Sequence, residues 1–458
     1  MPKSFDAVVI GTGQSGPPLA VRLAKSGEKV AIIERARFGG TCVNTGCIPT
    51  KTMVASARAA YVARRGADFG VELDGKVRID MQRVKARKDQ TSGKSRAGVE
   101  KMLNDASNCT VYRSQARFLS NSEVQVGEEI LTAPQIFINV GARAVIPAIQ
   151  GLSNLPYFTN SSFLEIDFLP KSLIVVGGSY VGLEFGQMFR RFGSEVTILQ
   201  RGPRLLGRED EDISNAVRDI LIKEGIEVAL NAECIELFGA AGAIGARTSS
   251  PDVAVVHGTH LLLAAGRQHN TADLGLENTA IKRDKRGFIE VDDELRTSVP
   301  GIWAIGDCNG RGAFTHTSYN DYEIVAANLL DKEKRRVTDR IVAYAVYIDP
   351  PLGRAGMTES EVRSSGRKAL IGKRAMTRVG RAVEKGETQG FMKILVDSNS
   401  HEILGAAILG TGGDEAIHCI LDTMYAKVPY TVLQRAVNIH PTVSELIPTM
   451  LGDLQPLC

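Results

Sequence analysis

The sequence predicts an α/β protein in which two similar βαβ units precede a C-terminal α+β unit. The first observation is an internal repeat. The β-branched run and glycine-rich turn of residues 4–16 (S-F-D-A-V-V-I-G-T-G-Q-S-G) return at 171–182 (K-S-L-I-V-V-G-G-S-Y-V-G). The second observation is that a further strand pattern follows each turn, at 29–33 and 195–199. The third is a charged stretch at 331–336, after which a new strand pattern begins.

The size and composition indicate a globular chain with several cores. A length of 458 residues predicts two to four domains. A net charge of +3 without a basic cluster gives no indication of nucleic acid as a partner. No uncharged apolar run approaches the length of a membrane span, and the first strand pattern starts too early for a signal peptide. We therefore expect no membrane partner and, by default, a cytoplasmic location.

The first glycine-rich turn has the pattern of a Rossmann-like dinucleotide-binding unit. Gly11, Gly13 and Gly16 follow a strand and open a helical pattern, and Glu34 lies 18 residues after Gly16. Glycines let the backbone approach a pyrophosphate, the helix N-terminus attracts its charge, and the acidic residue binds a ribose hydroxyl. The alternative is an ordinary loop, but the strand, the helix and Glu34 together favour nucleotide binding.

The second turn is an imperfect copy of the first. Gly177 and Gly182 keep their places, whereas Ser179 takes the middle glycine position and Gln200 stands where the first unit has its acidic residue. This turn alone would be ambiguous, but the matched spacing favours a second dinucleotide-binding unit.

The remaining patterns place elements around these two units. Helices are expected at 46–65, 86–106 and 213–224, strands and turns at 111–138, a glycine- and alanine-rich turn at 240–246, and a strand at 340–348.

Cys42 and Cys47 are the two cysteines whose spacing suggests a chemical role. A regular helix rises about 7.5 Å over five residues, whereas a disulfide needs Cα atoms roughly 4.4–6.8 Å apart. If the two are bonded, the helix must therefore be irregular between them, and Gly46 and Pro49 would supply the irregularity. A thiol at a helix start is biased toward thiolate. Two buried free cysteines are the alternative, and zinc is disfavoured because a second ligand pair is missing.

The segment 39–51 (G-G-T-C-V-N-T-G-C-I-P-T-K) resembles the signature of the pyridine nucleotide–disulfide oxidoreductases. Other segments resemble that family in the expected order along the whole chain. They are I-N-V-G-A-R (138–143), L-A-A-G-R-Q-H-N-T (263–271), V-P-G-I-W-A-I-G-D-C (299–308) and H-P-T-V-S-E (440–445). Within the family, the segments around 177–185 and 314–321 look closest to mercuric-reductase-like members.

The resemblance assigns catalytic roles to six residues. Cys47 resembles the thiol nearest the flavin, and Cys42 resembles the interchange thiol that attacks the substrate. Lys51 resembles the lysine beside the flavin, with Glu184 as its acidic partner. His440 resembles the acid/base, oriented by Glu445; in this family it acts on the cysteine pair of the other subunit, which implies a homodimer.

The resemblance also implies the positions that hold FAD and the nicotinamide nucleotide. For FAD, Gly11, Gly13 and Gly16 would bind the pyrophosphate, Glu34 the ribose and Asp307 the ribityl chain, with Thr315 and His316 facing the flavin. Further cofactor-contacting positions would be Thr41, Ala116, Gly141 and Gly266, and the nucleotide would lie on Gly177, Gly182, Gln200, Arg201 and Arg204.

NADPH is predicted over NADH. Members of the family that use NAD carry an acidic residue where this chain has Gln200, and Gln200 lacks the charge that would repel a 2′-phosphate. Arg201 and Arg204 follow, and guanidinium groups suit phosphate. The alternative is that both arginines face solvent and both nucleotides serve.

Three domains are implied. Residues 1–145 and 268–335 would form a discontinuous FAD-binding domain, 146–267 the NAD(P)H-binding domain, and 336–458 the dimerisation domain.

The predicted function is an FAD-dependent NADPH oxidoreductase that passes electrons to the Cys42–Cys47 disulfide. The final acceptor would be a small disulfide or a thiol-bound metal. Mercuric reduction is an alternative, but Hg(II) prefers two thiolates and the C-terminus carries a single cysteine, Cys458, which is better interpreted as a frayed terminal residue than as one arm of a metal relay. Two further hypotheses stay open at this point: direct reduction of a quinone, oxygen or a metal ion by the flavin, and a non-catalytic redox-sensing flavoprotein.

Overall fold

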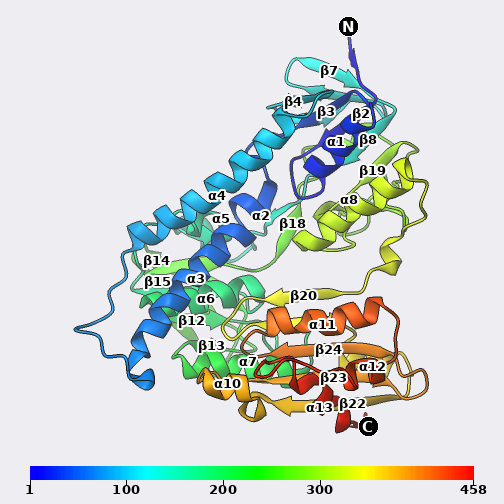
Figure 1. Cartoon of the computed structure of the whole chain (residues 1–458). Helices are drawn as coiled ribbons and strands as arrows, with labels where there is room; N and C mark the ends of the chain where they lie inside the picture. The colour runs from blue at the N-terminus through cyan, green and yellow to red at the C-terminus, as the bar shows by residue number, and fades with distance from the viewer. Residues whose placement is uncertain (458) are drawn as a thin grey trace.

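The β-branched runs of the repeat become central strands of two parallel sheets, because strands buried on both faces need apolar side chains throughout. The structure is a computed structural model and describes residues 1–457. The first unit lies at the top of Figure 1, the second below it on the left, and the third at the bottom. The N-terminus and the end of the described chain lie at opposite ends of the molecule (Figure 1).

The first unit contains a five-stranded parallel sheet in the order β19-β8-β2-β3-β4. Its strands are β2 (Ala7–Ile10), β3 (Val30–Ile33), β4 (Cys109–Tyr112), β8 (Gln135–Ile138) and β19 (Ile302–Ala304). A second sheet is formed by β1 (Lys3–Ser4), β5 (Ala116–Phe118), β6 (Glu123–Val126) and β7 (Glu129–Thr132). Strand β19 follows the second unit in sequence yet pairs in parallel with β8. The predicted domain boundaries themselves stay a prediction.

Among the described residues the first unit has five α-helices, of which the sequence patterns predict the first, the third and the fourth. The five are α1 (Gly16–Lys25), α2 (Gly40–Asn44), α3 (Cys47–Arg64), α4 (Met81–Asn104) and α8 (Thr315–Leu330). Helix α4 begins five residues before the expected position, because the Asp80 side chain caps it by accepting a hydrogen bond from Arg83 N at 3.0 Å.

The sheet of the second unit has the order β10-β17-β11-β12-β13, in which four strands repeat the order β8-β2-β3-β4 of the first unit and only the edge strand β10 differs. Its parallel strands are β10 (Phe158–Thr159), β11 (Ser172–Val176), β12 (Glu195–Leu199), β13 (Glu227–Ala229) and β17 (His260–Leu263). Its helices are α5 (Asn160–Phe163), α6 (Tyr180–Phe192) and α7 (Glu211–Lys223). The antiparallel pair β9 (Ala142–Ala144) and β18 (Arg267–His269) joins it to the first unit, within the segments 138–143 and 263–271.

The turn expected at 240–246 is wrong in extent. Most of this segment belongs to a three-stranded antiparallel sheet of β14 (Cys234–Ala240), β15 (Ala243–Thr248) and β16 (Val255–Gly258). Phe238 pairs with Gly245 across the first hairpin, and a side chain at Gly245 would collide with the Phe238 ring. Gly245, one of the small residues that suggest a loop, therefore accommodates an aromatic ring within a sheet.

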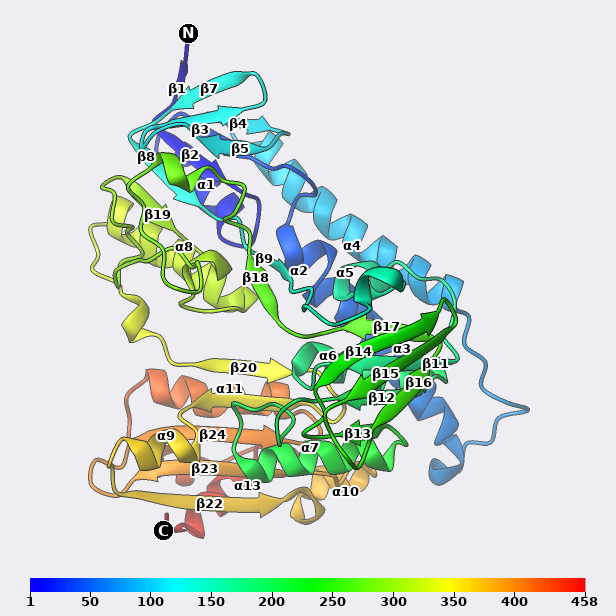
Figure 2. The same ribbon diagram turned by 180° about the vertical axis from the view of Figure 1, so that it is seen from behind.

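The third unit is a six-stranded antiparallel sheet, layered with helices in Figure 2. Its strands are β20 (Ala343–Val346), β21 (Leu352–Gly356), β22 (Ala369–Ala375), β23 (Phe391–Asp397), β24 (Ile403–Leu409) and β25 (Gln455–Pro456). Its helices are α9 (Glu359–Ser364), α10 (Gly380–Glu384), α11 (Gly413–Tyr425), α12 (Tyr430–Gln434) and α13 (Leu446–Gly452). Among the described residues, no helix is both long and apolar enough to cross a membrane.

A buried ion cluster joins the second and third units. Carboxylate oxygens of Asp210, Asp212 and Glu359 lie within 4.8 Å of one another, the spacing of a cation site. The Lys393 ammonium occupies that place, with its Nζ 2.9 Å from each aspartate and 2.7 Å from Glu359. Lys393 is fully buried. We therefore interpret the cluster as a docking contact between the units.

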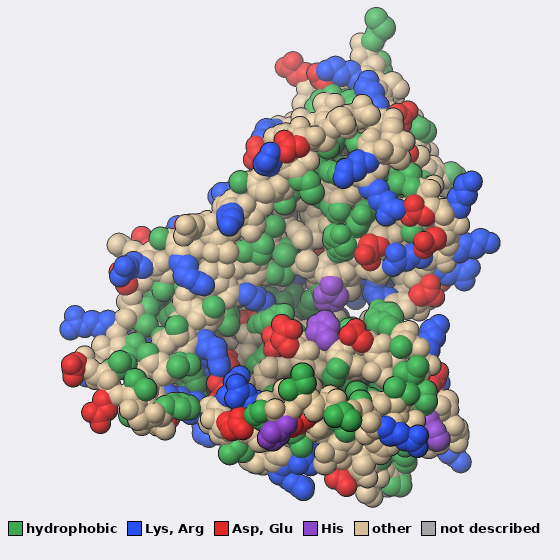
Figure 3. Space-filling view, viewed as in Figure 1, with side chains coloured by type: hydrophobic (Ala, Val, Ile, Leu, Met, Phe, Trp, Pro, Cys, Tyr) green, Lys and Arg blue, Asp and Glu red, His purple; other side chains and the backbone are tan. Residues whose placement is uncertain are grey.

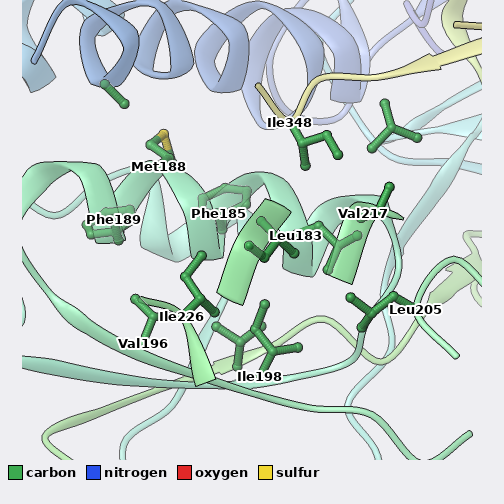
Figure 4. Close-up of a cluster of buried hydrophobic side chains, with 14 of the residues drawn as sticks. Leu183, Phe185, Met188, Phe189, Val196, Ile198, Leu205, Val217, Ile226 and Ile348 are labelled. Atoms are coloured by element: carbon green, nitrogen blue, oxygen red, sulfur yellow. The ribbon is translucent and has the colours of Figure 1, made fainter. Parts of the chain in front are cut away.

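The largest apolar core also spans units. Leu183 of α6 points toward β12 residues such as Ile198, and Phe185 of the same helix belongs to the same apolar cluster (Figure 4). On the opposite side of α6, Ile348 of the third unit enters the same cluster, beneath α3 (Figure 4). The helices that carry Lys51 and Glu184 are thus held against the third unit.

Candidate active site

A cleft of about 700 Å³ opens at the carboxyl ends of the first unit's parallel strands. In α/β sheets, this edge is where ligands bind. The residues predicted from the sequence that line it are Gly11, Gly13, Glu34, Thr41, Cys42, Cys47, Lys51, Ala116, Gly141, Glu184, Asp307, Thr315 and His316. Figure 3 shows the molecule hollowed at its centre, with histidine side chains near the hollow.

The two cysteines lie at a break between helices. Helix α2 ends at Asn44 and α3 begins at Cys47, so only Thr45 and Gly46 separate the helices. The predicted irregularity is therefore present at Gly46, whereas Pro49 lies within the regular first turn of α3. Cys42 is half-buried and Cys47 is exposed to the cleft, which does not fit the alternative of two buried cysteines. Both are thiols in this structure.

The surroundings of the pair favour a thiolate on Cys47. A hydrogen bond from Cys42 lowers the pKa of Cys47 most; burial opposes it, and the Thr315 hydroxyl and the Lys51 charge lower it further, to about 6. The Thr315 Oγ1 lies 3.2 Å from Cys47 Sγ. The same Cys42–Cys47 contact and burial raise the pKa of Cys42. At neutral pH, Cys47 carries the negative charge and Cys42 the proton.

Lys51 forms an ion pair at the wall of the cleft. Its Nζ lies 2.7 Å from Glu184 Oε2, and Glu184 is buried. The other carboxylate oxygen of Glu184 accepts a hydrogen bond from Tyr347 N at 2.9 Å. The Lys51 ammonium also lies 4.7 Å from the centre of the Tyr347 ring. The structure thus adds Tyr347, from the third unit, to a pair found in the sequence.

The first-unit end of the cleft fits a dinucleotide such as FAD. Glu34 directly follows β3, and its carboxylate accepts hydrogen bonds from Thr12 N at 3.1 Å and Ala36 N at 2.8 Å. Gly11 has φ +106, and a Cβ on it would collide with the carbonyl of Asn139. Only glycine therefore allows the turn to pack this closely against the end of β8. Gly16 does not line the cleft; it begins α1, packed against Gly11.

Two polar residues of the site were missed from the sequence, although both lie in segments that resemble the family. The Asn139 side chain accepts a hydrogen bond from Gly16 N at 3.0 Å and donates to Ile305 O at 3.0 Å, fixing the glycine-rich turn. Arg267 donates to Ala142 O at 2.7 Å and lies 3.4 Å from Asp307, whose pKa is raised by burial. A search for buried polar residues within the crossing segments would have found them.

The residues predicted to bind the nicotinamide nucleotide lie outside this cleft, and their glycine-rich turn is a copy of the first. Gln200 Oε1 accepts a hydrogen bond from Gly178 N at 3.0 Å, and a Cβ on Gly182 would collide with the carbonyl of Gly177. The side chains of Arg201, which is exposed, and Arg204, which is half-buried, make no hydrogen bond or ion pair within residues 1–457. Gly266 has φ +128 and lies next to β18.

His440 and Glu445 form a pair away from the cleft. His440 Nδ1 lies 2.9 Å from Glu445 Oε2, and the histidine side chain is 79% exposed. Neither residue lines the cleft of the same chain. This is the arrangement expected if the pair serves the cysteines of another subunit. The predicted tail residue Cys458 lies outside the described residues.

A second cavity, of about 660 Å³, has a structural explanation. It lies where α3, α6 and α7 end. Arg64 donates to Arg191 O, and Arg190 Nε donates to Glu224 O at 2.8 Å. Basic side chains are favourable at helix C-termini, where carbonyls lack helical partners. The arginine side chains around this cavity therefore serve as hydrogen-bond donors to the last carbonyls of these helices.

The other cysteines differ in burial. Cys234 and Cys308 are buried, whereas Cys109 and Cys419 are only half-buried. Burial raises the pKa of Cys308 to about 12, so this neighbour of Asp307 stays a thiol at neutral pH.

Comparison with protein families identifies the two parts of the chain. The model described as pyridine nucleotide-disulphide oxidoreductase matches residues 5–321, and that of the family's dimerisation domain matches residues 342–451. The chain is 37% identical to the probable pyridine nucleotide-disulfide oxidoreductase RclA of Escherichia coli, over 96% of this chain and 97% of RclA. It is 32% identical to a dihydrolipoyl dehydrogenase of Cupriavidus necator (98% and 97% covered) and 29% identical to a mercuric reductase of Staphylococcus aureus (90% and 76%).

A solved structure is similar over the full length. It is the Cu(II) complex of the HOCl-induced flavoprotein disulfide reductase RclA from Escherichia coli, with a TM-score of 0.90, 36% identity and 99% of both chains covered. The chain therefore belongs to the pyridine nucleotide–disulphide oxidoreductase family. It is an NAD(P)H-dependent flavoprotein oxidoreductase, and its dimerisation domain supports a homodimer.

Proposed function

We propose that this member of the family uses NADPH to reduce the Cys42–Cys47 pair, which passes electrons to an acceptor that reacts with thiols. The observation that carries the proposal is the unequal thiol pair at the cleft, in which Cys47 has a pKa of about 6 and Cys42 is protonated. When bound, FAD would supply the electron transfer between nucleotide and sulfur. Gly11, Gly13, Glu34 and Asp307 would hold it, with Lys51 and Glu184 at the wall.

Each predicted domain would bind a different component. Residues 1–145 and 268–335 would bind FAD, 146–267 the nucleotide, and 336–458 the second subunit. Gln200, Arg201 and Arg204 would select NADPH, because Gln200 brings no negative charge and the two guanidinium groups are free of carboxylates within residues 1–457. His440 of one subunit would exchange protons with Cys42 of the other, and Glu445 would orient its imidazole.

The acceptor we favour is a thiophilic metal ion, with Cu(II) first. The solved RclA complex contains Cu(II), and thiolates suit copper. Two Cu(II) ions would take one electron each from the dithiol, giving two Cu(I), the Cys42–Cys47 disulfide and two protons. A small disulfide is the second candidate, favoured by the His440–Glu445 pair, which would protonate a departing thiolate. In that reaction the disulfide becomes two thiols while the enzyme pair becomes oxidised.

The test is anaerobic NADPH oxidation by the FAD-loaded enzyme, with Cu(II), Hg(II) under excess thiol, or a small disulfide as acceptor. Native enzyme should turn over with Cu(II), and Cu(I) should appear at two per NADPH. Cys42→Ser should reduce turnover at least about a hundredfold, because the interchange thiol is lost. Turnover that survives in Cys42→Ser would show direct reduction from the flavin and reject the proposal.

Two further outcomes separate the competing functions. Steady turnover with Hg(II) that falls in Cys458→Ser would indicate mercuric reduction through the tail. Flavin that is reduced by NADPH yet reoxidised by none of these acceptors would favour a redox-sensing flavoprotein.

A further inference from the structure

The third unit reaches the wall of the cleft through Tyr347, directly after β20. Tyr347 and Ala345 are its residues that line the cleft. Tyr347 is 37% exposed, and its ring lies 4.7 Å from Lys51 Nζ. At this distance an ammonium is attracted by the negative face of an aromatic ring. Tyr347 therefore contacts the cation that the family places beside the flavin.

The contact belongs to a closed arrangement of three groups. Tyr347 N donates to one oxygen of Glu184 at 2.9 Å, and the other oxygen accepts from Lys51 Nζ at 2.7 Å. The backbone of Tyr347 thus fixes the carboxylate while its ring faces the ammonium. Glu184 is held from one side by its own helix and from the other by the third unit.

The turn that carries Tyr347 is firmly anchored. Ile348 is buried in the core above α6 (Figure 4). Asp349 N donates to Gln187 Oε1 at 2.7 Å, and Gln187 Nε2 donates back to Asp349 O at 2.7 Å. Arg58 Nη1 lies 2.6 Å from the Asp349 carboxylate. The contacts with Gln187 of α6 and Arg58 of α3 fix the backbone of this turn, so the Tyr347 side chain keeps its direction.

We propose that Tyr347 is a positioning residue that holds the Lys51 ammonium at the wall of the flavin cleft. The proposal rests on the proposed function, since it needs FAD in this cleft. Without the ring, Lys51 keeps Glu184 as its one anchor among the described residues, and its four-carbon side chain gains freedom to leave the wall. The third unit, which carries the dimerisation domain, then contributes to the electrostatics of the cofactor site.

The measurable consequence is the reduction potential of bound flavin. A cation held beside the ring favours the electron-rich reduced form, and a cation that moves a few ångströms away favours it less. Tyr347→Leu should therefore make the flavin harder to reduce, shifting its equilibrium with a redox dye by roughly two- to fivefold. Lys51→Met should shift the equilibrium in the same direction and further.

The experiment titrates FAD-loaded protein against the dye in a Cys42→Ser/Cys47→Ser background, so that the flavin alone takes electrons. Tyr347→Phe is the matched control, because it keeps the ring face and should leave the equilibrium unchanged. In the Lys51→Met background, Tyr347→Leu should add nothing, since the two residues act as one unit. Tyr347→Met replaces Tyr347→Leu if the latter fails to retain FAD.

Three results would overturn the proposal. They are an unchanged equilibrium in Tyr347→Leu, a shift in Tyr347→Phe as large as that in Tyr347→Leu, and an undiminished effect of Tyr347→Leu in the Lys51→Met background. The titration contains no nucleotide and no acceptor. Its three comparisons of the flavin–dye equilibrium therefore stay valid even if the proposed acceptor is wrong.

Discussion

Gln200 makes the same contact in the second βαβ unit that Glu34 makes in the first. Gln200 Oε1 accepts from Gly178 N at 3.0 Å, and Glu34 Oε2 accepts from Thr12 N at 3.1 Å. The two residues directly follow equivalent strands, β12 and β3, and contact equivalent glycine-rich turns. They differ in charge, because the amide is neutral where the carboxylate is negative.

Exchange of this one group should change the choice of nucleotide. In Gln200→Glu the new carboxylate can accept a ribose hydroxyl but repels a 2′-phosphate. We expect the ratio of kcat/KM for NADPH to that for NADH to fall about tenfold or more, equivalent to at least ~1.4 kcal/mol. Steady-state kinetics with both nucleotides measure the ratio. An unchanged ratio would mean that residue 200 does not face the 2′ position.

The two arginines next to it provide an independent check. Arg201→Ala and Arg204→Ala should weaken NADPH use by roughly three- to thirtyfold each and leave NADH use almost unchanged, because NADH lacks the phosphate that they would bind. Equal losses with both nucleotides would assign the arginines to general binding or to folding.

The low pKa of Cys47 predicts a pH dependence. Because the pKa is lowered to about 6, the thiolate is present above that pH and lost as the pH falls through it. In Cys42→Ser, where a hydroxyl keeps a donor, the visible absorbance of a thiolate beside oxidised flavin should disappear with a midpoint near this value. Thr315→Val removes one hydrogen bond to Cys47 and should raise the midpoint by roughly half a unit. A midpoint above about 8 in Cys42→Ser would contradict the arrangement.

The local parts of this site could be predicted from the sequence, and the long-range parts could not. Cys42, Cys47 and Gly11–Gly16 lie in contiguous motifs whose spacing carries the chemistry. The break between α2 and α3 was predicted from the geometry of a disulfide, although Pro49 was wrongly given a share in it.

Tyr347 and Lys393 act through contacts that cross domains, and no short pattern reports such contacts. Lys51 and Tyr347 are separated by 296 positions in the chain, and their approach depends on the docking of the third unit on α6. The extent of the 240–246 turn was missed for a similar reason, because the role of Gly245 depends on Phe238 across the hairpin. Sequence patterns therefore predict the helix or strand to which a residue belongs better than they predict which distant residue it contacts.

Loss of the buried ammonium in the docking cluster should destabilise the protein strongly. Lys393→Met removes the buried cation that contacts all three carboxylates, at a cost of about 3–5 kcal/mol. Lys373, 46% exposed and 2.7 Å from Asp212, is the matched control, and Lys373→Met should cost under about 1 kcal/mol. Urea unfolding of both variants gives the comparison, and equal losses would contradict the role of Lys393.

The same cluster predicts a loss of stability in acid. Burial raises the pKa of Asp210, but the hydrogen bond and charge of Lys393, with the backbone hydrogen bond from Glu359 and the charge of Arg354, outweigh it and lower the pKa to about 2. The folded value lies below the unfolded one, so the carboxylate stabilises the fold above about pH 4, and this contribution disappears between about pH 4 and 2. Lys393→Met should show a smaller decline over that range. An equal decline in native protein and variant would assign the acid sensitivity to other groups.

The exposed His440–Glu445 pair yields a test of the shared site. If His440 serves the cysteines of the partner subunit, Cys42→Ser and His440→Ala homodimers are each inactive in disulfide or Cu(II) reduction. Mixed subunits give half heterodimers, and each heterodimer has one site with both native residues and one with neither. Activity should therefore return to about a quarter of the native value after random reassembly. If the histidine acted within its own chain, every site would lack one residue and mixing would restore nothing. The 79% exposure of His440 and its absence from the cleft of its own chain favour the first outcome.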